Sequence, residues 1–111
     1  MSGETALLSA ILDTLRRVPG IRVMRNAVGS AKKGKAYVRF GLGTGSPDIV
    51  GFTTAGARFI GLEVKAPDGV VSAEQFQWLA DLRASGGFGA VVRSVDDAVK
   101  AVERAKGGEC E

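Results

Sequence analysis

Residues 45–67 read GSPDIVGFTTAGARFIGLEVKAP, a stretch with two runs of strand-forming residues. The runs at 48–52 and 58–65 are separated by a short segment that contains a glycine, a pattern that predicts a β-hairpin. Asp48, Glu63 and Lys65 interrupt these otherwise apolar strands with charge. Because an unpaired carboxylate is costly to bury, such charges are usually paired, bound to a metal or part of a site.

The geometry of a hairpin predicts that these charged side chains meet. Side chains alternate along a strand, so Glu63 and Lys65 share one face, and Asp48 on the partner strand can lie beside Glu63. Two adjacent carboxylates repel each other unless a proton or a cation lies between them, and hard oxygen ligands favour Mg²⁺ or Mn²⁺ over Zn²⁺. Mg²⁺ usually binds one or two carboxylates plus substrate phosphate, so we expect phosphodiester chemistry. Lys65 can then orient or deprotonate the attacking water, or stabilise charge that develops on the phosphate.

The rest of the chain predicts one mixed β-sheet flanked by helices, an α/β or α+β fold. Helices are expected at 4–17, 72–85 and 94–106, and further strands at 21–27, 35–42 and 88–93. The glycine-containing basic segment GSAKKGK at 29–35 is expected to be a mobile loop, and 41–45 a flexible connection. Residues 35–42 alternate two cations and a tyrosine with apolar side chains, which predicts a half-buried strand whose polar face can meet phosphate.

The composition narrows the class of protein. The chain has 111 residues, 45% hydrophobic and 24% charged, so we expect one globular domain over residues 1–111. Histidine is absent and Cys110 is the only cysteine, which excludes a Ser-His-Asp triad, a His-based metal site and an intrachain disulfide. No apolar run reaches the ~20 residues of a membrane span and no signal peptide is recognisable, so a cytoplasmic, non-secreted protein is expected. The net charge of +3 suits a polyanionic partner.

Two longer patterns resemble a known family. Pro47-Asp48 followed by Glu63-Val64-Lys65 resembles the active-site motif of the PD-(D/E)xK nuclease superfamily. More narrowly, GSPDIVGF, GLEVKAPDGVVSAEQFQWL and ASGGFGAVVRSVDDA resemble the VRR-NUC family of virus-type replication-repair nucleases, over roughly residues 4–98. The resemblance implies a restriction-endonuclease-like fold and a metal-dependent DNA endonuclease. We expect hydrolysis that leaves a 5′-phosphate and a 3′-hydroxyl.

The same resemblance implies roles for the residues of the two motifs. Asp48 and Glu63 would bind Mg²⁺ or Mn²⁺ together with the backbone carbonyl of Val64. Lys65 would serve the attacking water. These assignments agree with the chemistry that the hairpin predicts for the same side chains.

Three polar residues outside the hairpin have two interpretations each. Glu4 matches an acidic position that completes the site in the family, but a carboxylate in the first turn of a helix is also favoured by the helix dipole. Gln75 matches a glutamine that supports the site, but Ser72 and Gln75 also form the pattern of a capping box. Asn26 interrupts an apolar strand and either contacts the site or caps a turn.

The resemblance also implies partners. Small stand-alone relatives are typically viral homodimers that act on branched DNA such as four-way (Holliday) junctions, which would place this chain in the cytoplasm of a host cell. Arg22 and Arg58 add to the positive charge near the site in sequence. The candidate nucleic-acid-binding residues are Arg25, Lys32, Lys33, Lys35 and Arg39, unless these cations only keep the surface soluble.

Two other classes of protein remain as alternatives. One is a catalytically silent nucleic-acid-binding module on the same fold, for which two carboxylates facing a phosphate would be of no use. The other is a purely structural partner-binding domain, which would leave those carboxylates unexplained and predicts no metal affinity. With one tryptophan and few other aromatic residues, the chain has no base-stacking platform, so we expect recognition of DNA shape more than of sequence.

Overall fold

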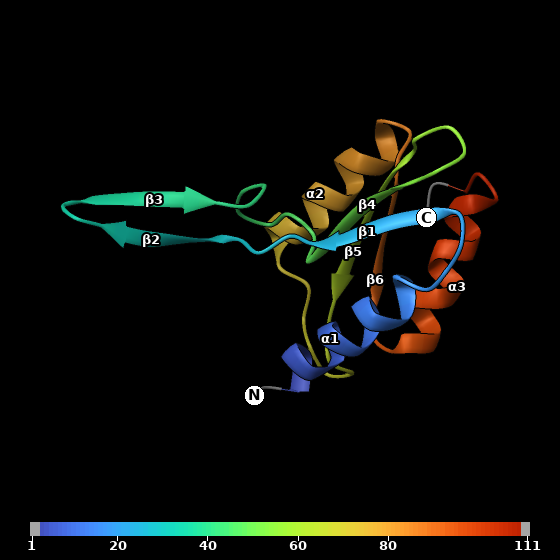
Figure 1. Ribbon diagram of the computed structural model, residues 1–111, viewed down its shortest axis with the longest axis horizontal. Coiled ribbons are helices and arrows are strands. Elements are labelled where there is room, and N and C mark those ends of the chain that lie inside the picture. Colours follow the sequence, from blue (N-terminus) through green and yellow to red (C-terminus); the bar gives the residue numbers. More distant parts are fainter. Residues whose placement is uncertain (1–2, 110–111) are drawn as a thin grey trace.

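The computed structural model describes residues 3–109, so the cysteine at the C-terminal end lies outside the described residues. The elements are α1 (Gly3–Leu15), β1 (Ile21–Arg25), β2 (Gly29–Lys33), β3 (Ala36–Phe40), β4 (Ile49–Thr53), β5 (Phe59–Val64), α2 (Ala73–Ala84), β6 (Phe88–Val92) and α3 (Val95–Lys106). Figure 1 shows a body built from the helices and four of the strands, and an arm formed by β2 and β3 that extends away from it.

The body contains one mixed four-stranded sheet in the order β1-β4-β5-β6. Strands β4 and β5 form the antiparallel hairpin predicted from the sequence, with Phe52 opposite Phe59 and Ile49 opposite Leu62. Strand β6 pairs with β5 in parallel, and α2 makes the crossover between them, because parallel neighbours need a long connection. The predicted mixed α/β fold is therefore confirmed.

The core lies between the sheet and the pair of helices α1 and α3. Helix α1 contributes Ile11 and Leu15, both fully buried, and the hairpin strand β5 contributes Ile60 and Leu62 from the same face of the sheet. Helix α3 presents small buried residues such as Ala101, which allow it to approach closely. This packing anchors β5 rigidly, and β5 carries the predicted catalytic glutamate.

Helix α2 covers part of the opposite face of the sheet. Gly61 and Gly89 are register partners on β5 and β6, and they create the space that the helix needs. A Cβ atom added at Gly61 would lie 2.8 Å from Pro47 Cγ and 2.9 Å from Leu82 Cδ2. The two glycines therefore let α2 and the segment before β4 pack directly on the sheet. Next to α2, Met24 and Phe52 help to line an apolar hollow of about 410 Å³.

The arm corrects two of the predictions from sequence. Residues 29–33 of the predicted mobile loop form strand β2, paired in register with β3 from Gly29–Phe40 to Lys33–Ala36. Polar residues carry little strand signal, but pairing with β3 through a tight turn with Gly34 at φ 63° satisfies the backbone. Strand β3 is also not half-buried: every one of its residues is exposed, because among the described strands it pairs with β2 alone.

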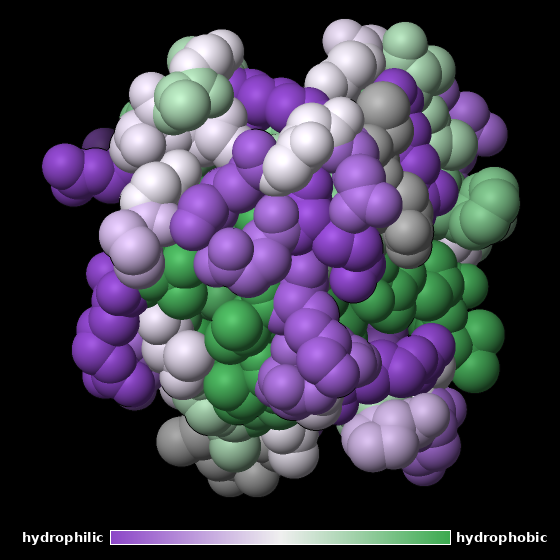
Figure 2. All heavy atoms as spheres, turned by 90° about the vertical axis from the view of Figure 1, so that its right-hand side faces the viewer, coloured by the Kyte–Doolittle hydropathy of each residue, from purple (hydrophilic) through white to green (hydrophobic). Residues whose placement is uncertain are grey.

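The described residues contain no helix that has both the length and the apolar character needed to cross a bilayer. Figure 2 views the end of the molecule opposite the arm, where hydrophilic side chains cover most of the surface and hydrophobic ones gather in a band across the middle. The charged arm thus lies at the other end of the molecule from this surface.

Candidate active site

The site lies where β4 begins and β5 ends. Because Ile49 pairs with Leu62, the preceding Asp48 comes level with Glu63 on the neighbouring strand. The Asp48 Oδ2 atom accepts a hydrogen bond of 2.8 Å from the backbone N–H of Val64. The N–H and C=O of a strand residue point to the same side, so the Val64 carbonyl also faces Asp48. The structure thus places Asp48 beside Glu63, with the backbone of Val64 in contact with Asp48.

Glu63 is the one charged residue among the largest fully buried side chains of the described chain, at 2% exposure. Its Oε1 atom accepts a hydrogen bond of 3.0 Å from Gln75 Nε2, whereas no group within residues 3–109 donates one to its buried Oε2 atom. Burial above all, and then the neighbouring Asp48, raise the pKa of Glu63 to about 9. The arrangement requires a positive partner at this oxygen, either a proton or a cation.

Gln75 fulfils both of the roles that the sequence left open. Its backbone N–H donates to Ser72 Oγ at 3.1 Å and its Oε1 atom accepts from the Ser72 N–H at 2.9 Å, which completes the capping box of α2. With its oxygen held by the cap, the side-chain NH₂ group is directed at Glu63. The start of α2 therefore fixes the orientation of the buried carboxylate.

Glu4 reaches the same end of the sheet from the first turn of α1. It lines a cleft of about 200 Å³ together with Arg25 and Asp48, and the N–H of Ala66 donates to its Oε2 atom at 3.4 Å. Its charge contributes to the raised pKa of Glu63, although less than burial and Asp48 do. Among residues 3–109, no three His, Cys, Asp or Glu side chains form a group suited to hold a metal ion.

Lys65 directly follows β5 and is half-buried. Its backbone N–H donates to Val92 O at 3.1 Å, and its positive charge opposes the rise in the pKa of Glu63. The loop after it is held by Arg93, whose Nη1 atom donates to the carbonyls of Ala66 and Gly69, both at 2.8 Å. Sequence reasoning missed this role of Arg93, since nothing in the sequence shows which carbonyls a distant arginine meets.

Asn26 holds the segment that leads to Asp48. Its Nδ2 atom donates to Ser46 Oγ and to Pro47 O, both at 2.8 Å, and its Oδ1 atom accepts from the N–H of Leu42 at 3.1 Å. Its own backbone N–H donates to Asp48 O at 2.8 Å. Asn26 is therefore a positioning residue, and the predicted flexible connection at 41–45 is fastened to β1 at both ends.

The predicted nucleic-acid-binding cations divide into separate groups. Arg25 lines the cleft beside Asp48, whereas the other four predicted cations are exposed on the arm or its turn. Arg58 lies elsewhere: its guanidinium donates to Gly86 O at 2.9 Å and Ala105 O at 3.0 Å, near the ends of α2 and α3. Arg58 is near the site residues in sequence but not in space. It lies just before the start of β5, whereas the site lies at the other end of that strand.

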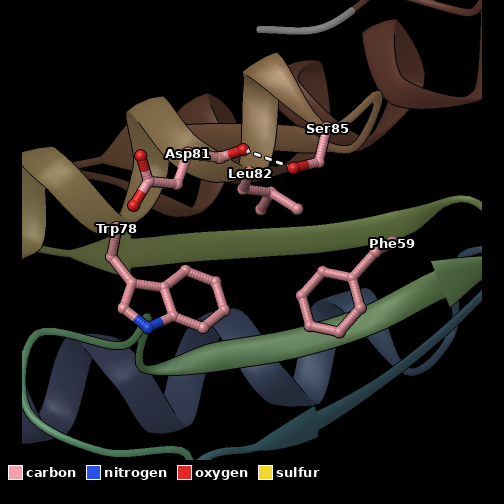
Figure 3. A pocket seen from close by; sticks show the side chains of 5 residues that line it. All are labelled: Phe59, Trp78, Asp81, Leu82 and Ser85. Carbon is pink, nitrogen blue, oxygen red and sulfur yellow. Dashed lines mark hydrogen bonds between the residues drawn. The ribbon is translucent and has the colours of Figure 1, made fainter.

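A second hollow lies over the outer face of β5, away from the carboxylates. Trp78 and Phe59 line this space of about 280 Å³, with their ring centroids 6.3 Å apart, and both rings point into it from opposite elements (Figure 3). Ser85, on the same wall, donates to the Asp81 carbonyl at 2.8 Å. The lining is aromatic and aliphatic with a single carboxylate, so this hollow does not resemble a phosphodiester site.

The architecture and the comparison with known families agree on the class of protein. A mixed sheet with helices on both faces is compatible with the restriction-endonuclease-like fold. The VRR-NUC domain model matches residues 13–96, well over half of the 111-residue chain, and the chain therefore belongs to this family of nucleases. The match includes Asp48, Glu63, Lys65 and Gln75 but begins after Glu4. Comparisons with curated proteins and with solved structures find no match.

Proposed function

We propose that this chain is a metal-dependent DNA endonuclease whose catalytic centre is formed by Asp48, Glu63 and Lys65. The observation that carries the proposal is the buried Oε2 atom of Glu63, which lies beside a second carboxylate and receives no hydrogen bond from the described residues. A purely structural glutamate at 2% exposure would be expected to have its oxygens paired. A divalent cation supplies the missing positive partner.

The donor atoms present fit Mg²⁺ or Mn²⁺. Asp48, Glu63 and the Val64 carbonyl offer only oxygen, which these hard cations prefer, and the chain has no histidine to favour zinc. When bound, the metal would supply Lewis acidity toward the scissile phosphate. Gln75 holds one oxygen of Glu63 and thereby leaves the other free for the cation.

The remaining residues of the centre serve water and substrate. Lys65 orients the attacking water or stabilises the charge that grows on the phosphate. The water oxygen loses a proton and forms the new bond to phosphorus, while the bond from phosphorus to the 3′ oxygen breaks and that oxygen takes up a proton from solvent. The products are a 5′-phosphate and a 3′-hydroxyl. Glu4 adds a further carboxylate to the cleft, and this carboxylate can accept the proton that the attacking water loses. Arg25 lines the same cleft and can contact the neighbouring phosphate.

The family resemblance and the charge distribution support a proposal for the substrate and the assembly. Small relatives act as homodimers on branched DNA, and a two-fold dimer would present two catalytic centres to the two symmetric incisions of a Holliday junction. We therefore propose branched DNA as substrate, a homodimer as the working form, and a viral protein acting in the host cell cytoplasm. The exposed cations of the arm support a nucleic-acid partner.

Cleavage of labelled substrates tests the proposal. A four-way junction, a flap and a linear duplex are incubated with wild type or Lys65→Ala in Mg²⁺, Mn²⁺ or EDTA, and Asp13→Asn on the exposed side of α1 serves as the matched control. We expect wild type and the control to cut with metal only, and Lys65→Ala to lose cutting. Binding of all three substrates without cutting in either metal would instead support the catalytically silent module.

A further inference from the structure

The arm is the most prominent surface feature that the catalytic centre does not use. Strands β2 and β3 pair only with each other, and the arm projects along the longest axis of a molecule measuring 47 × 30 × 26 Å (Figure 1). It leaves the body after Arg25, which lines the cleft, and returns through 41–47 to Asp48. The arm therefore starts and ends beside the candidate active site.

The pairing register gives the arm two different faces. Directly opposed residues of an antiparallel pair lie on the same face, so Ser30–Arg39 and Lys32–Tyr37 share one face. The other face carries Ala31, Ala36, Val38 and Phe40 around a single cation, Lys33. One face is thus polar, cationic and phenolic, with Tyr37 exposed at 73%.

An arm of this kind needs a partner. An isolated two-stranded hairpin is at best marginally stable in water, and this one leaves all five residues of β3 exposed. No acidic residue occurs between positions 5 and 47 except Asp13, so no acidic side chain of the arm itself neutralises Lys32 and Arg39. Its polar face is therefore complementary to a polyanion.

We propose that the arm lies in the major groove of duplex DNA, with Ser30, Lys32, Tyr37 and Arg39 facing the DNA. The major groove of B-DNA is about 12 Å wide and accepts a two-stranded β-ribbon. Single-stranded DNA would instead call for several stacking aromatic side chains, and this face offers only Tyr37. The inference rests on the proposed function for its DNA partner, but the binding itself requires no metal and no cleavage.

The connection to the body gives this contact a consequence for the substrate. Asn26, which follows β1, binds the segment that returns from the arm at Leu42, Ser46 and Pro47, so the base of the arm is held in a fixed position relative to Asp48. A duplex seated on the arm is thereby directed past the cleft. The arm would select a substrate with a double-stranded segment next to the scissile phosphate.

Binding in EDTA tests the arm separately from catalysis. Fluorescence anisotropy measures the affinity for a labelled blunt duplex and for one of its strands, over a series of salt concentrations, for wild type and the double variant Lys32→Gln/Arg39→Gln. The charge-preserving Lys32→Arg/Arg39→Lys and the distant pair Arg16→Gln/Arg17→Gln, exposed at the other end of α1, are the matched controls.

We expect the neutral arm variant to bind duplex roughly tenfold or more weakly near 0.1 M salt, with the salt slope reduced by about 1.8 for two lost phosphate contacts. The loss for single-stranded DNA should be much smaller, and both controls should bind duplex as wild type does. Unchanged duplex binding, or an equal loss for single and double strands, would overturn the proposal. This assay contains no metal, so its result does not depend on cleavage. If wild type binds duplex through the arm but cuts no substrate in Mg²⁺ or Mn²⁺, only the proposed nuclease activity would be refuted.

Discussion

At the scale of single residues, the chemistry depends on how Glu63 is neutralised. The carboxyl group is buried beside Asp48, which raises its pKa to about 9, and Gln75 satisfies only one of its oxygens. Without metal, the folded protein therefore keeps a proton that the unfolded chain releases above its ordinary pKa of 4.5. In the proposed metal centre, the same oxygen would exchange this proton for a cation.

This exchange predicts a pH dependence of stability. For an acid whose pKa is raised by folding, the stability is complete below 4.5 and is lost as the pH rises toward about 9. The free energy of unfolding of the metal-free protein should fall by about 1.4 kcal/mol per pH unit in the middle of this window. Urea denaturation in EDTA across the window measures it. Glu63→Gln should remove this pH dependence, and Mn²⁺ should reduce it in wild type. If the free energy of unfolding fell equally steeply with pH in Glu63→Gln, the dependence would come from other groups.

Arg93 should matter for rate more than for metal binding. Arg93→Gln removes the donor to Ala66 and Gly69, so the loop that follows Lys65 loses its fixed position. Because small displacements of a catalytic group are costly, we expect cleavage to slow roughly 10- to 100-fold while Mn²⁺ affinity is nearly unchanged. Single-turnover cleavage and calorimetric Mn²⁺ titration separate the two effects.

Arg83→Gln is the matched control for this change. Arg83 also donates to a carbonyl, that of Gly89 at 2.8 Å, but it belongs to the last turn of α2 and contacts β6 instead of the loop. If both variants lost the same activity, general destabilisation would explain the effect and Arg93 would have no positioning role.

At the scale of elements, the hairpin and the helix that covers it determine where the carboxylates lie. Strands β4 and β5 set Asp48 against Glu63, and the capping box at the start of α2 directs Gln75 toward Glu63. Helix α2 reaches this position because Gly61 leaves room for Leu82 and Pro47. The site is thus sensitive to a methyl group placed between strand and helix.

Gly61→Ala tests this packing. The added Cβ would lie 2.8 Å from Pro47 Cγ and 2.9 Å from Leu82 Cδ2, so we expect a loss of about 1–3 kcal/mol in the free energy of unfolding and weaker cleavage through displacement of the segment before Asp48. Gly3→Ala, where an added Cβ meets nothing within 4 Å, should leave both unchanged. Thermal denaturation and the cleavage assay are the measurements. Wild-type stability in Gly61→Ala would contradict the close packing of α2.

The elements that the sequence predicted are those with a local signal. The β4–β5 hairpin combines apolar strands with a glycine-containing turn, and the helices from 72 and 94 begin at serine caps, Ser72 and Ser94, as expected. Strand β2 has only small and charged residues, and its pairing with β3 is a tertiary property that no local pattern reports. The roles of Asn26, Arg58 and Arg93 were open or missed for the same reason, since each contacts backbone far away along the chain.

At the scale of the whole molecule, the described residues form a cleft lined by Glu4 and Asp48 and a cationic arm that leaves the body beside it. A single centre can cut one strand, whereas resolution of a four-way junction needs two symmetric cuts. The proposed homodimer would provide the second centre by two-fold symmetry. The chain belongs to a family of nucleases. The homodimer is the part of the proposal that accounts for branched DNA as substrate.

Mixed dimers test this assembly. Sedimentation velocity should give twice the 11.5 kDa mass of one chain, and wild type alone should make paired cuts in a four-way junction. When wild type is mixed with an excess of Lys65→Ala, most active dimers carry one working centre, so the products should shift from paired cuts to single nicks. A monomer in sedimentation that still makes paired cuts would contradict the dimer.

The most direct test of the central claim is Mn²⁺ binding by calorimetry in the absence of DNA. It compares wild type with Asp48→Asn, Glu63→Gln, Lys65→Ala and the exposed control Asp13→Asn. We predict that wild type, Lys65→Ala and Asp13→Asn bind Mn²⁺, and that Asp48→Asn and Glu63→Gln bind at least about tenfold more weakly, because each removes a ligand. Equal binding by all variants, or none by wild type, would contradict a metal centre at Asp48 and Glu63.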